Sequence, residues 1–294
     1  MPIPVGCSTI SGIAALENPR ILDGKTILFD AHFFIYDTPQ NCDFAGVSLL
    51  RYFNGNDRYF GDVEKYFVHA EVALMDEKCN MAFLTEGTSR EDYFMVGDIL
   101  QLIPADRDSE YKEDTKYPPF LTVGGIVDKV DDKWKQSPRS FHIDLNPNIY
   151  IQLLQPPKSK PQPNEPDARQ TPSTPGSKKE RVYGHMPVHC FIPESPRWPA
   201  APSVRIGNFV TVAGYLQSVR RNDSKAVTGF NLELERVTYM GQPSANQLAA
   251  PPVIKRMAGT PAGSLTPPQK RMKFSYGNYQ DTPTPPSRKS SEDH

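Results

Sequence analysis

Long hydrophobic runs and signal sequences are missing from this 294-residue sequence. No stretch approaches the ~20 apolar residues of a membrane-spanning helix, so we expect no membrane partner. The apolar run 10–16 is short, is interrupted by Ser11 and Gly12, and has no basic segment before it. We therefore do not expect a secretory signal peptide. These absences predict a protein of the nucleus or the cytosol.

Cysteine is sparse, and the four cysteines are Cys7, Cys42, Cys79 and Cys190. They do not form the close pairs of a metal-binding motif, and they are too few for a disulfide-stabilised scaffold. We expect free thiols in a reducing compartment. His185 and His189 are four residues apart, but Pro187 lies between them and opposes the helix that would align their rings. The sequence predicts no metal site and no cofactor.

Sequence signatures of common enzymes are also absent. The chain contains no GxSxG nucleophile elbow, no GxGxxG or P-loop phosphate site, and no HExxH zinc motif. We expect no catalytic residues and no enzymatic activity.

Proline, in contrast, is abundant. The 30 prolines are about twice the usual share of ~5%. A β-sheet excludes most prolines, because each one removes a backbone hydrogen-bond donor. They concentrate in residues 156–181 and 241–294, where apolar residues are too few to offset the entropy of ordering. We predict a disordered linker over 156–181 and a disordered tail over 241–294.

Charge is balanced in total, at a formal net charge of -1, but unevenly distributed. Residues 76–132 are acid-rich, whereas the tail is basic, which indicates a polyanionic partner, an acidic receptor such as a nuclear importer, or contact with the body itself. The cluster Lys270, Arg271 and Lys273 is a candidate nuclear-import signal; a merely solvating tail is the alternative. Thr-Pro dipeptides in both proline-rich segments suit proline-directed kinases.

Strand-like patterns fill the rest of the chain. Runs rich in β-branched and aromatic residues, with alternation or turn residues at their ends, predict strands at residues 26–36, 47–53, 66–75, 95–103, 120–130, 140–145, 150–154, 186–192, 208–219 and 229–237. A helix is the alternative over 66–75. The chain is therefore predicted to be mainly β.

These strands group into two blocks. We expect a loosely ordered lead-in over 1–24 and a β-rich domain over 25–155. After the linker, residues 182–240 form either a second β-rich unit or the completion of the first barrel.

Glycines within the strands carry the strongest fold signal. Gly207-Asn208 predicts a tight turn, and Gly214 interrupts the next strand where a small barrel coils sharply. Val96-Gly97-Asp98 repeats the pattern. A Val-His pair also precedes each of these glycines in the sequence, at Val68-His69 before Gly97 and at Val188-His189 before Gly207. This repeated order indicates either two copies of one barrel unit or chance.

This pattern resembles the oligonucleotide/oligosaccharide-binding (OB) fold, as in the tandem barrels of replication protein A and telomere end-binding proteins. The resemblance covers 25–155 and 182–240 and implies one or two OB-like antiparallel β-barrels that bind single-stranded nucleic acid. The whole chain also resembles fungal proteins of this β-rich kind, which implies no function.

OB folds bind single strands by stacking bases on aromatic side chains inside a basic groove. Cations and aromatics alternate at the candidate residues Arg51, Tyr52, Arg58, Tyr59, Lys133, Trp134, Lys135, Arg139, Arg197 and Trp198. Trp134 and Trp198 are the strongest candidates, because their polar, loop-like surroundings do not suit a core. Against this, most aromatics of small barrels are core residues, and an acidic body repels phosphates.

Two functions remain open. The first is a nuclear, non-enzymatic protein that binds single-stranded DNA or RNA, or a subunit of such a complex. The alternative is a protein-interaction scaffold that uses barrel grooves or edges without binding nucleic acid. Protein partners are expected in both cases, and the oligomeric state is open.

Overall fold

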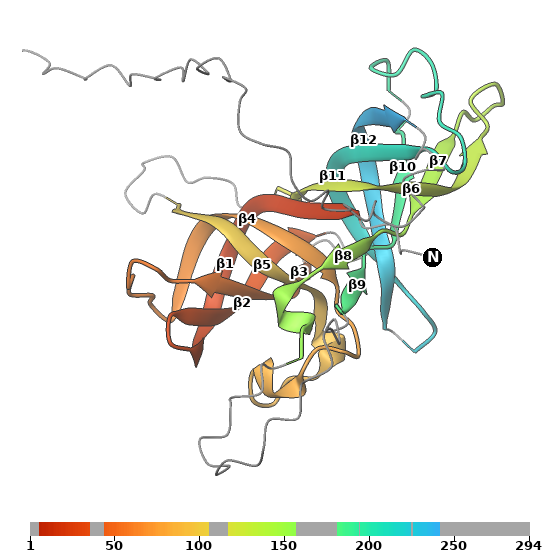
Figure 1. Ribbon diagram of the computed structural model, residues 1–294. Coiled ribbons are helices and arrows are strands. Elements are labelled where there is room, and N and C mark those ends of the chain that lie inside the picture. The colour runs from red at the N-terminus through yellow and green to blue at the C-terminus, as the bar shows by residue number, and fades with distance from the viewer. Residues whose placement is uncertain are drawn as a thin grey trace, which may run out of the picture. The chain divides into compact units, whose positions relative to one another are not determined.

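The computed structural model describes residues 6–35, 44–105, 117–156, 181–193, 195–224 and 226–241. Most of the predicted linker, the predicted tail, the import signal Lys270, Arg271 and Lys273, and the Thr-Pro sites lie outside these residues. The described chain is mainly β, as predicted, with three short 3-10 helices, η1 (Met81–Phe83), η2 (Arg90–Asp92) and η3 (Gln152–Leu154) (Figure 1). In this part of the chain, no helix has the length and apolar character to cross a membrane.

Five strands close the first barrel (Figure 1). They are β1 (Cys7–Asp23), β2 (Thr26–Ile35), β3 (Phe44–Phe53), β4 (Val63–Leu74) and β5 (Tyr93–Pro104). The pairing runs β1–β2–β3–β5–β4 and returns to β1, and the β3–β5 pair is parallel. A five-stranded barrel with this Greek-key order has the architecture of the OB fold.

A second barrel repeats this order. Its strands are β6 (Phe120–Asp132), β7 (Phe141–Leu145), β10 (Val188–Phe191), β11 (Phe209–Arg221) and β12 (Val227–Gly241). They pair as β6–β7–β10–β12–β11 and return to β6, with β10 and β12 parallel. The structure therefore has two OB-like barrels. Each includes one parallel pair, so neither is wholly antiparallel.

The barrels divide the chain differently from the predicted blocks. The connection between barrels is 105–119, because β6 and β7 pair with strands that follow the linker. The linker 156–181 thus belongs to an insertion inside the second barrel, between β8 (Asn148–Tyr150) and β9 (Tyr183–His185), which pair with each other. The predicted strand 150–154 is replaced by the end of β8 and by η3.

The predicted lead-in 1–24 is also wrong for Cys7–Asp23, which forms β1. Ile10, Ala14 and Leu16 of this strand are buried in the core. Small residues such as Gly12 and Ala15 weaken the β-branched signal, but neighbouring strands on both sides hold β1 in an extended conformation. The helix alternative for 66–75 is excluded, because these residues lie in β4 and the turn after it.

Contacts join the insertion to the first barrel. The Gln152 backbone N–H donates to Oδ2 of Asp98 at 2.9 Å, and the Lys78 Nζ donates to the Tyr183 carbonyl at 3.2 Å. Within the insertion, the Gln155 side chain holds both backbone groups of Val182, at 2.7 and 3.2 Å.

The two barrels share one sheet. Residues 7–11 of β1 pair with residues 120–124 of β6, so ten strands form one continuous sheet.

The predicted glycine roles are mostly confirmed. Gly207 has φ +83° in the turn before β11, and Gly214 lies at a register shift where an added Cβ would overlap the Glu233 carbonyl. The predicted turn at Gly97-Asp98 is wrong, since both residues lie inside β5. The two barrels repeat one strand order, but the Val-His segments do not mark equivalent strands, because His69 lies on the fourth strand of its barrel and His189 on the third.

Candidate nucleic-acid interface

Trp134 and Trp198 meet at one cavity of the second barrel. Trp134 lies in the β6–β7 hairpin and Trp198 in the connection from β10 to β11, yet both line a hollow of about 280 Å³. Arg139, Ser195, Pro196 and Pro199 complete its lining. Both indoles are half-buried and pack against the core, so part of each ring is exposed to the cavity. The structure thus brings together the two strongest sequence candidates.

Local turns place the two indoles there. In the hairpin, the Lys133 N–H donates to the Ser140 carbonyl at 2.9 Å, and the Trp134 N–H donates to Oδ1 of Asp132 at 3.0 Å. In the other connection, the Trp198 N–H donates to the Ser195 carbonyl at 3.3 Å. Both indoles therefore project from hydrogen-bonded turns rather than from open loops.

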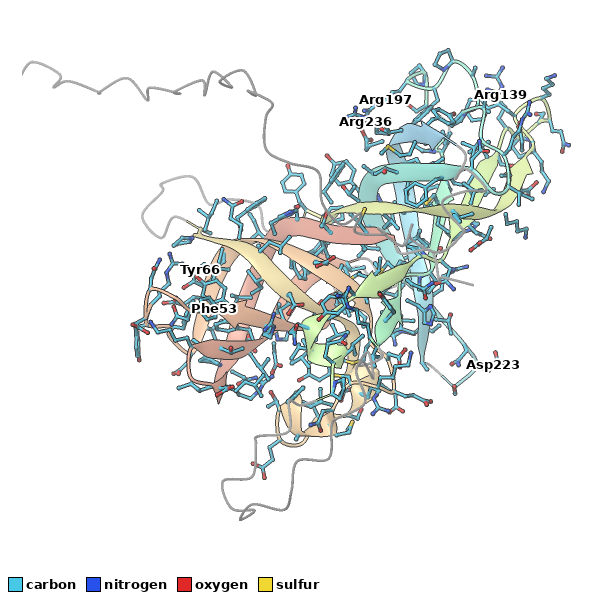
Figure 2. The ribbon with its side chains drawn as sticks, viewed as in Figure 1. Phe53, Tyr66, Arg139, Arg197, Asp223 and Arg236 are labelled. Atoms are coloured by element: carbon cyan, nitrogen blue, oxygen red, sulfur yellow. The ribbon has the colours of Figure 1, made fainter. Side chains whose placement is uncertain are left out.

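Cations surround this cavity, but some are already paired. Lys133 Nζ lies 2.9 Å from a carboxylate oxygen of Asp131, and Arg197 pairs with Glu235. Lys135 and Arg139 are exposed, and the ion pairs of the described chain include neither of them. Figure 2 shows Arg139, Arg197 and Arg236 at the same end of this barrel. Arg236 of β12 is exposed and is not among the residues predicted from the sequence, because it lies in a strand whose alternation marks only its buried face.

Arg51 and Tyr52 lie on the first barrel and serve its structure. Arg51 Nε lies 2.5 Å from Oδ1 of Asp98, which joins β3 to β5. The Tyr52 ring packs edge-on against Phe60, with ring centroids 5.8 Å apart. The two residues therefore lie apart from the tryptophan cavity, with their charged or aromatic groups engaged inside the protein.

Arg58 and Tyr59 line a separate cavity of about 360 Å³ on the first barrel. It lies between the β1–β2 hairpin and the β3–β4 connection, over Ile27 and Phe60. Tyr59 is 89% exposed and Ile21 is 78% exposed. Five of the ten candidates line these two cavities: Arg58, Tyr59, Trp134, Arg139 and Trp198. Lys133, Lys135 and Arg197 are sequence neighbours of the two tryptophans but do not line the cavity, and Arg51 and Tyr52 lie in the wall of the first barrel.

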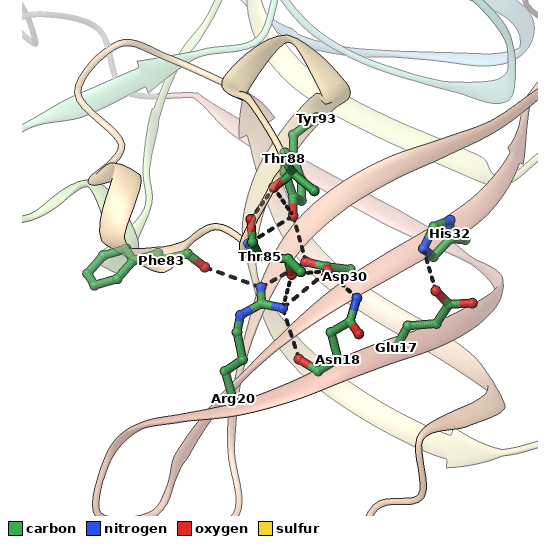
Figure 3. Close-up of polar contacts among 9 residues, drawn as sticks. All are labelled: Glu17, Asn18, Arg20, Asp30, His32, Phe83, Thr85, Thr88 and Tyr93. Atoms are coloured by element: carbon green, nitrogen blue, oxygen red, sulfur yellow. Dashed lines mark hydrogen bonds and ion pairs between the residues drawn. The ribbon is translucent and has the colours of Figure 1, made fainter.

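A polar network covers part of the first barrel (Figure 3). Asp30 of β2 accepts hydrogen bonds from Arg20 at 2.8 Å, Thr85 at 2.5 Å and Tyr93 at 2.9 Å. Burial opposes ionisation of Asp30, but the hydrogen bonds from Arg20, Thr85 and Asn18 outweigh it and lower the pKa of the carboxyl. The network holds the β4–β5 connection against β2 and buries Asp30 beneath it.

The corresponding surface of the second barrel is open. His142 and Asp144 of β7 and His189 of β10 are half-buried on its outer face. Burial and the neighbouring His189 lower the pKa of His142. In the OB fold, the face of the second and third strands is the one that binds oligonucleotides and oligosaccharides. Those strands are β7 and β10 here.

The described part of the chain shows no group of His, Cys, Asp or Glu placed to hold a metal ion. Cys79 and Cys190 are buried free thiols, and Cys7 is an exposed one. Burial raises the pKa of Cys79 to about 11 and raises that of Cys190 further. A thiol that stays protonated is a poor nucleophile, so neither buried cysteine has the character of a reactive residue.

No protein-family model and no curated protein sequence matches this chain. Among solved structures, the single-stranded DNA binding protein from Thermus aquaticus matches with a TM-score of 0.38 and 12% identity, over 83% of this chain and 96% of that one. A deletion mutant of that protein matches with a TM-score of 0.39 and 11% identity, over 86% and 100% of the two chains. Similarity at this level does not transfer DNA binding to this chain.

Proposed function

We propose that this chain is a non-enzymatic protein that binds single-stranded DNA or RNA through its second barrel. The cavity where Trp134 and Trp198 meet Arg139 carries this proposal. Two partly exposed indoles beside a cation provide the aromatic platform and the positive charge that single strands need. Each stacked base contributes about 1–3 kcal/mol.

The surroundings of the cavity set the expected strength of binding. Asp131 and Glu235 neutralise two of the nearby cations, which leaves few positive charges for phosphates. Each phosphate contact releases counterions, so binding weakens as salt rises. We therefore expect moderate affinity that is best measured at low salt.

The cavity can be observed directly, because the chain has only two tryptophans and both line it. Titration with a single-stranded oligonucleotide should change the intrinsic tryptophan fluorescence, and a labelled oligonucleotide gives the affinity by anisotropy. Trp134→Ala and Trp198→Ala should each weaken binding by roughly tenfold or more. Tyr215→Ala is the matched control, since Tyr215 is an exposed aromatic of the same barrel outside the cavity.

Absence of binding at low salt would overturn the proposal. Binding that survives the double Trp134→Ala and Trp198→Ala substitution would overturn the stacking mechanism. Tryptophan fluorescence that stays constant while a labelled oligonucleotide binds would place the ligand elsewhere.

The cavity beside Tyr59 favours a second candidate function, a protein-interaction scaffold. Ile21 and Tyr59 are large, exposed side chains over an apolar floor, a feature typical of a protein contact. Co-purification of partners with the full chain should then be lost on Ile21→Ser combined with Tyr59→Ser. Oligonucleotide affinity should not change.

Nuclear location is part of the proposal and rests on the basic tail. Deleting residues 242–294 from a fluorescent fusion should move it out of the nucleus, and replacing Lys270, Arg271 and Lys273 by Ala should do the same. An unchanged distribution would discard the import signal.

A further inference from the structure

A second hollow, of about 220 Å³, lies on the open face of the second barrel. Lys129 and Asp131 of β6, His142 and Asp144 of β7, and His189 of β10 line it. Neither the tryptophan cavity nor the core accounts for this group of charged and titratable side chains.

The two histidines are stacked. Their ring centroids lie 4.9 Å apart, with 16° between the planes. His189 Nδ1 lies 2.6 Å from Oδ1 of Asp144, whereas Nδ1 of His142 is buried and has no hydrogen-bond partner. The pair therefore has one ring anchored to a carboxylate and one ring with unused hydrogen-bonding capacity.

The charge of this hollow changes sign with the histidines. When both rings are neutral, Lys129 and Lys133 face Asp128, Asp131 and Asp144, an excess of one negative charge (two cations minus three anions). When both rings are protonated, four cations face the same three anions. From β12, the residue opposite His189 is the uncharged Asn231, and Glu233 opposite Phe191 accepts a hydrogen bond from Gln217.

The hollow lies on β7 and β10, whereas the tryptophan cavity is lined by the connections that precede β7 and follow β10. Arg139 lines the tryptophan cavity three residues before His142, a distance of about 10 Å along an extended chain. Ser195 of the tryptophan cavity likewise follows His189 on the chain that leaves β10. A single strand with a base between the indoles can thus extend its backbone toward the histidines.

We propose that His142 and His189 form a phosphate subsite that continues the tryptophan cavity along β7 and β10 and strengthens as pH falls. This inference rests on the proposed function. Imidazolium N–H groups donate charge-assisted hydrogen bonds to phosphate oxygens. Histidine changes charge between about pH 5 and 8, so the hollow becomes attractive to phosphates within that range.

The sign of the pH effect follows from linkage. A phosphate binds protonated imidazole better than neutral imidazole, so affinity rises as pH falls. Burial and the second ring lower the pKa of free His142, so its proton is taken up at lower pH than is usual for histidine. The hydrogen bond from Lys133 lowers the pKa of Asp131, so this carboxylate stays ionised across the range tested. Burial and Asp144 raise the pKa of Asp128, and a variant without the two histidines separates the contribution of Asp128 from that of the rings.

The test is the affinity for a fluorescein-labelled single-stranded oligonucleotide from pH 8 to pH 5.5. The unaltered protein should gain about tenfold or more, as expected for a charge-assisted contact. His142→Gln combined with His189→Gln keeps polar side chains that do not titrate, and its affinity should stay nearly constant with pH. His69→Gln is the control, because His69 is a half-buried histidine of the first barrel that bonds to Ser11. Far-ultraviolet circular dichroism at each pH verifies folding.

An oligonucleotide with an uncharged methylphosphonate backbone separates phosphate contacts from base contacts, and its affinity should not rise at low pH. A rise equal to that of natural DNA would overturn the phosphate subsite. The phosphate subsite would also be overturned if the double variant His142→Gln, His189→Gln bound with the same pH dependence as the unaltered protein. The proposed binding at the tryptophan cavity would then still stand. No binding at any pH would overturn the proposed function and this inference together.

Discussion

Nε of Arg51 on β3 lies 2.5 Å from Oδ1 of Asp98 on β5, and this ion pair joins the two parallel strands of the first barrel. The other carboxylate oxygen of Asp98 accepts the backbone N–H of Gln152 from the insertion. Arg51, which was predicted from the sequence to contact nucleic acid, thus pairs with a carboxylate that links β3 to β5 and binds the insertion.

Arg51→Ala should destabilise the protein without weakening oligonucleotide binding. It leaves Asp98, which is mostly buried, without its cationic partner, and we expect a loss of about 1–3 kcal/mol in the free energy of unfolding. Urea unfolding measures the loss. Arg58→Ala is the control, since Arg58 is exposed and its removal should change stability by only about 0.5 kcal/mol or less. If the Arg51→Ala protein were as stable as the unaltered protein but bound the oligonucleotide more weakly, Arg51 would belong to the nucleic-acid interface.

Asp30 should make stability depend on acid pH. Its folded pKa is lowered, so its contribution is present above the unfolded pKa of about 3.9 and is lost as pH falls through the folded pKa. Asp30→Asn should lower the free energy of unfolding at pH 7 by about 1–3 kcal/mol. The difference from the unaltered protein should shrink below pH 4. Asp57→Asn, at an exposed ion pair, should show little of this behaviour in thermal unfolding.

Arg139→Ala should reduce the salt dependence of binding. If Arg139 contacts one phosphate, its loss lowers the slope of log affinity against log salt by about 1. Tyr59→Ala on the first barrel should leave both affinity and slope unchanged. If Tyr59→Ala lowers the affinity and the slope while Arg139→Ala changes neither, the nucleic-acid interface lies instead at the cavity that Tyr59 lines.

Gly214→Ala should destabilise the second barrel, because its Cβ would overlap the Glu233 carbonyl. Overpacking of this kind costs about 1–3 kcal/mol. Gly61→Ala is the control, since its Cβ would meet only the flexible end of the Glu64 side chain. Equal melting temperatures for the two variants would contradict the close approach of β11 and β12.

Much of this molecule could be predicted from local patterns. Alternation placed most strands, as in Ser140 to Leu145, where His142 and Asp144 share the outer face. The polar surroundings of Trp134 and Trp198 marked them as surface residues, and Gly214 marked a bend. These features depend only on a residue and its neighbours in the sequence, so a local pattern is enough to predict them.

Pairing between distant segments could not be predicted in this way. Local residue patterns were enough to predict a β-rich chain, most of its turns and two tryptophans outside the barrel core. Tertiary structure decided that β6 and β7 join strands beyond the linker, that Arg51 is held by Asp98, and that the two indoles share one cavity. The reason is physical: a strand's backbone hydrogen bonds can be satisfied by many partners, and only the packing of the whole barrel selects among them.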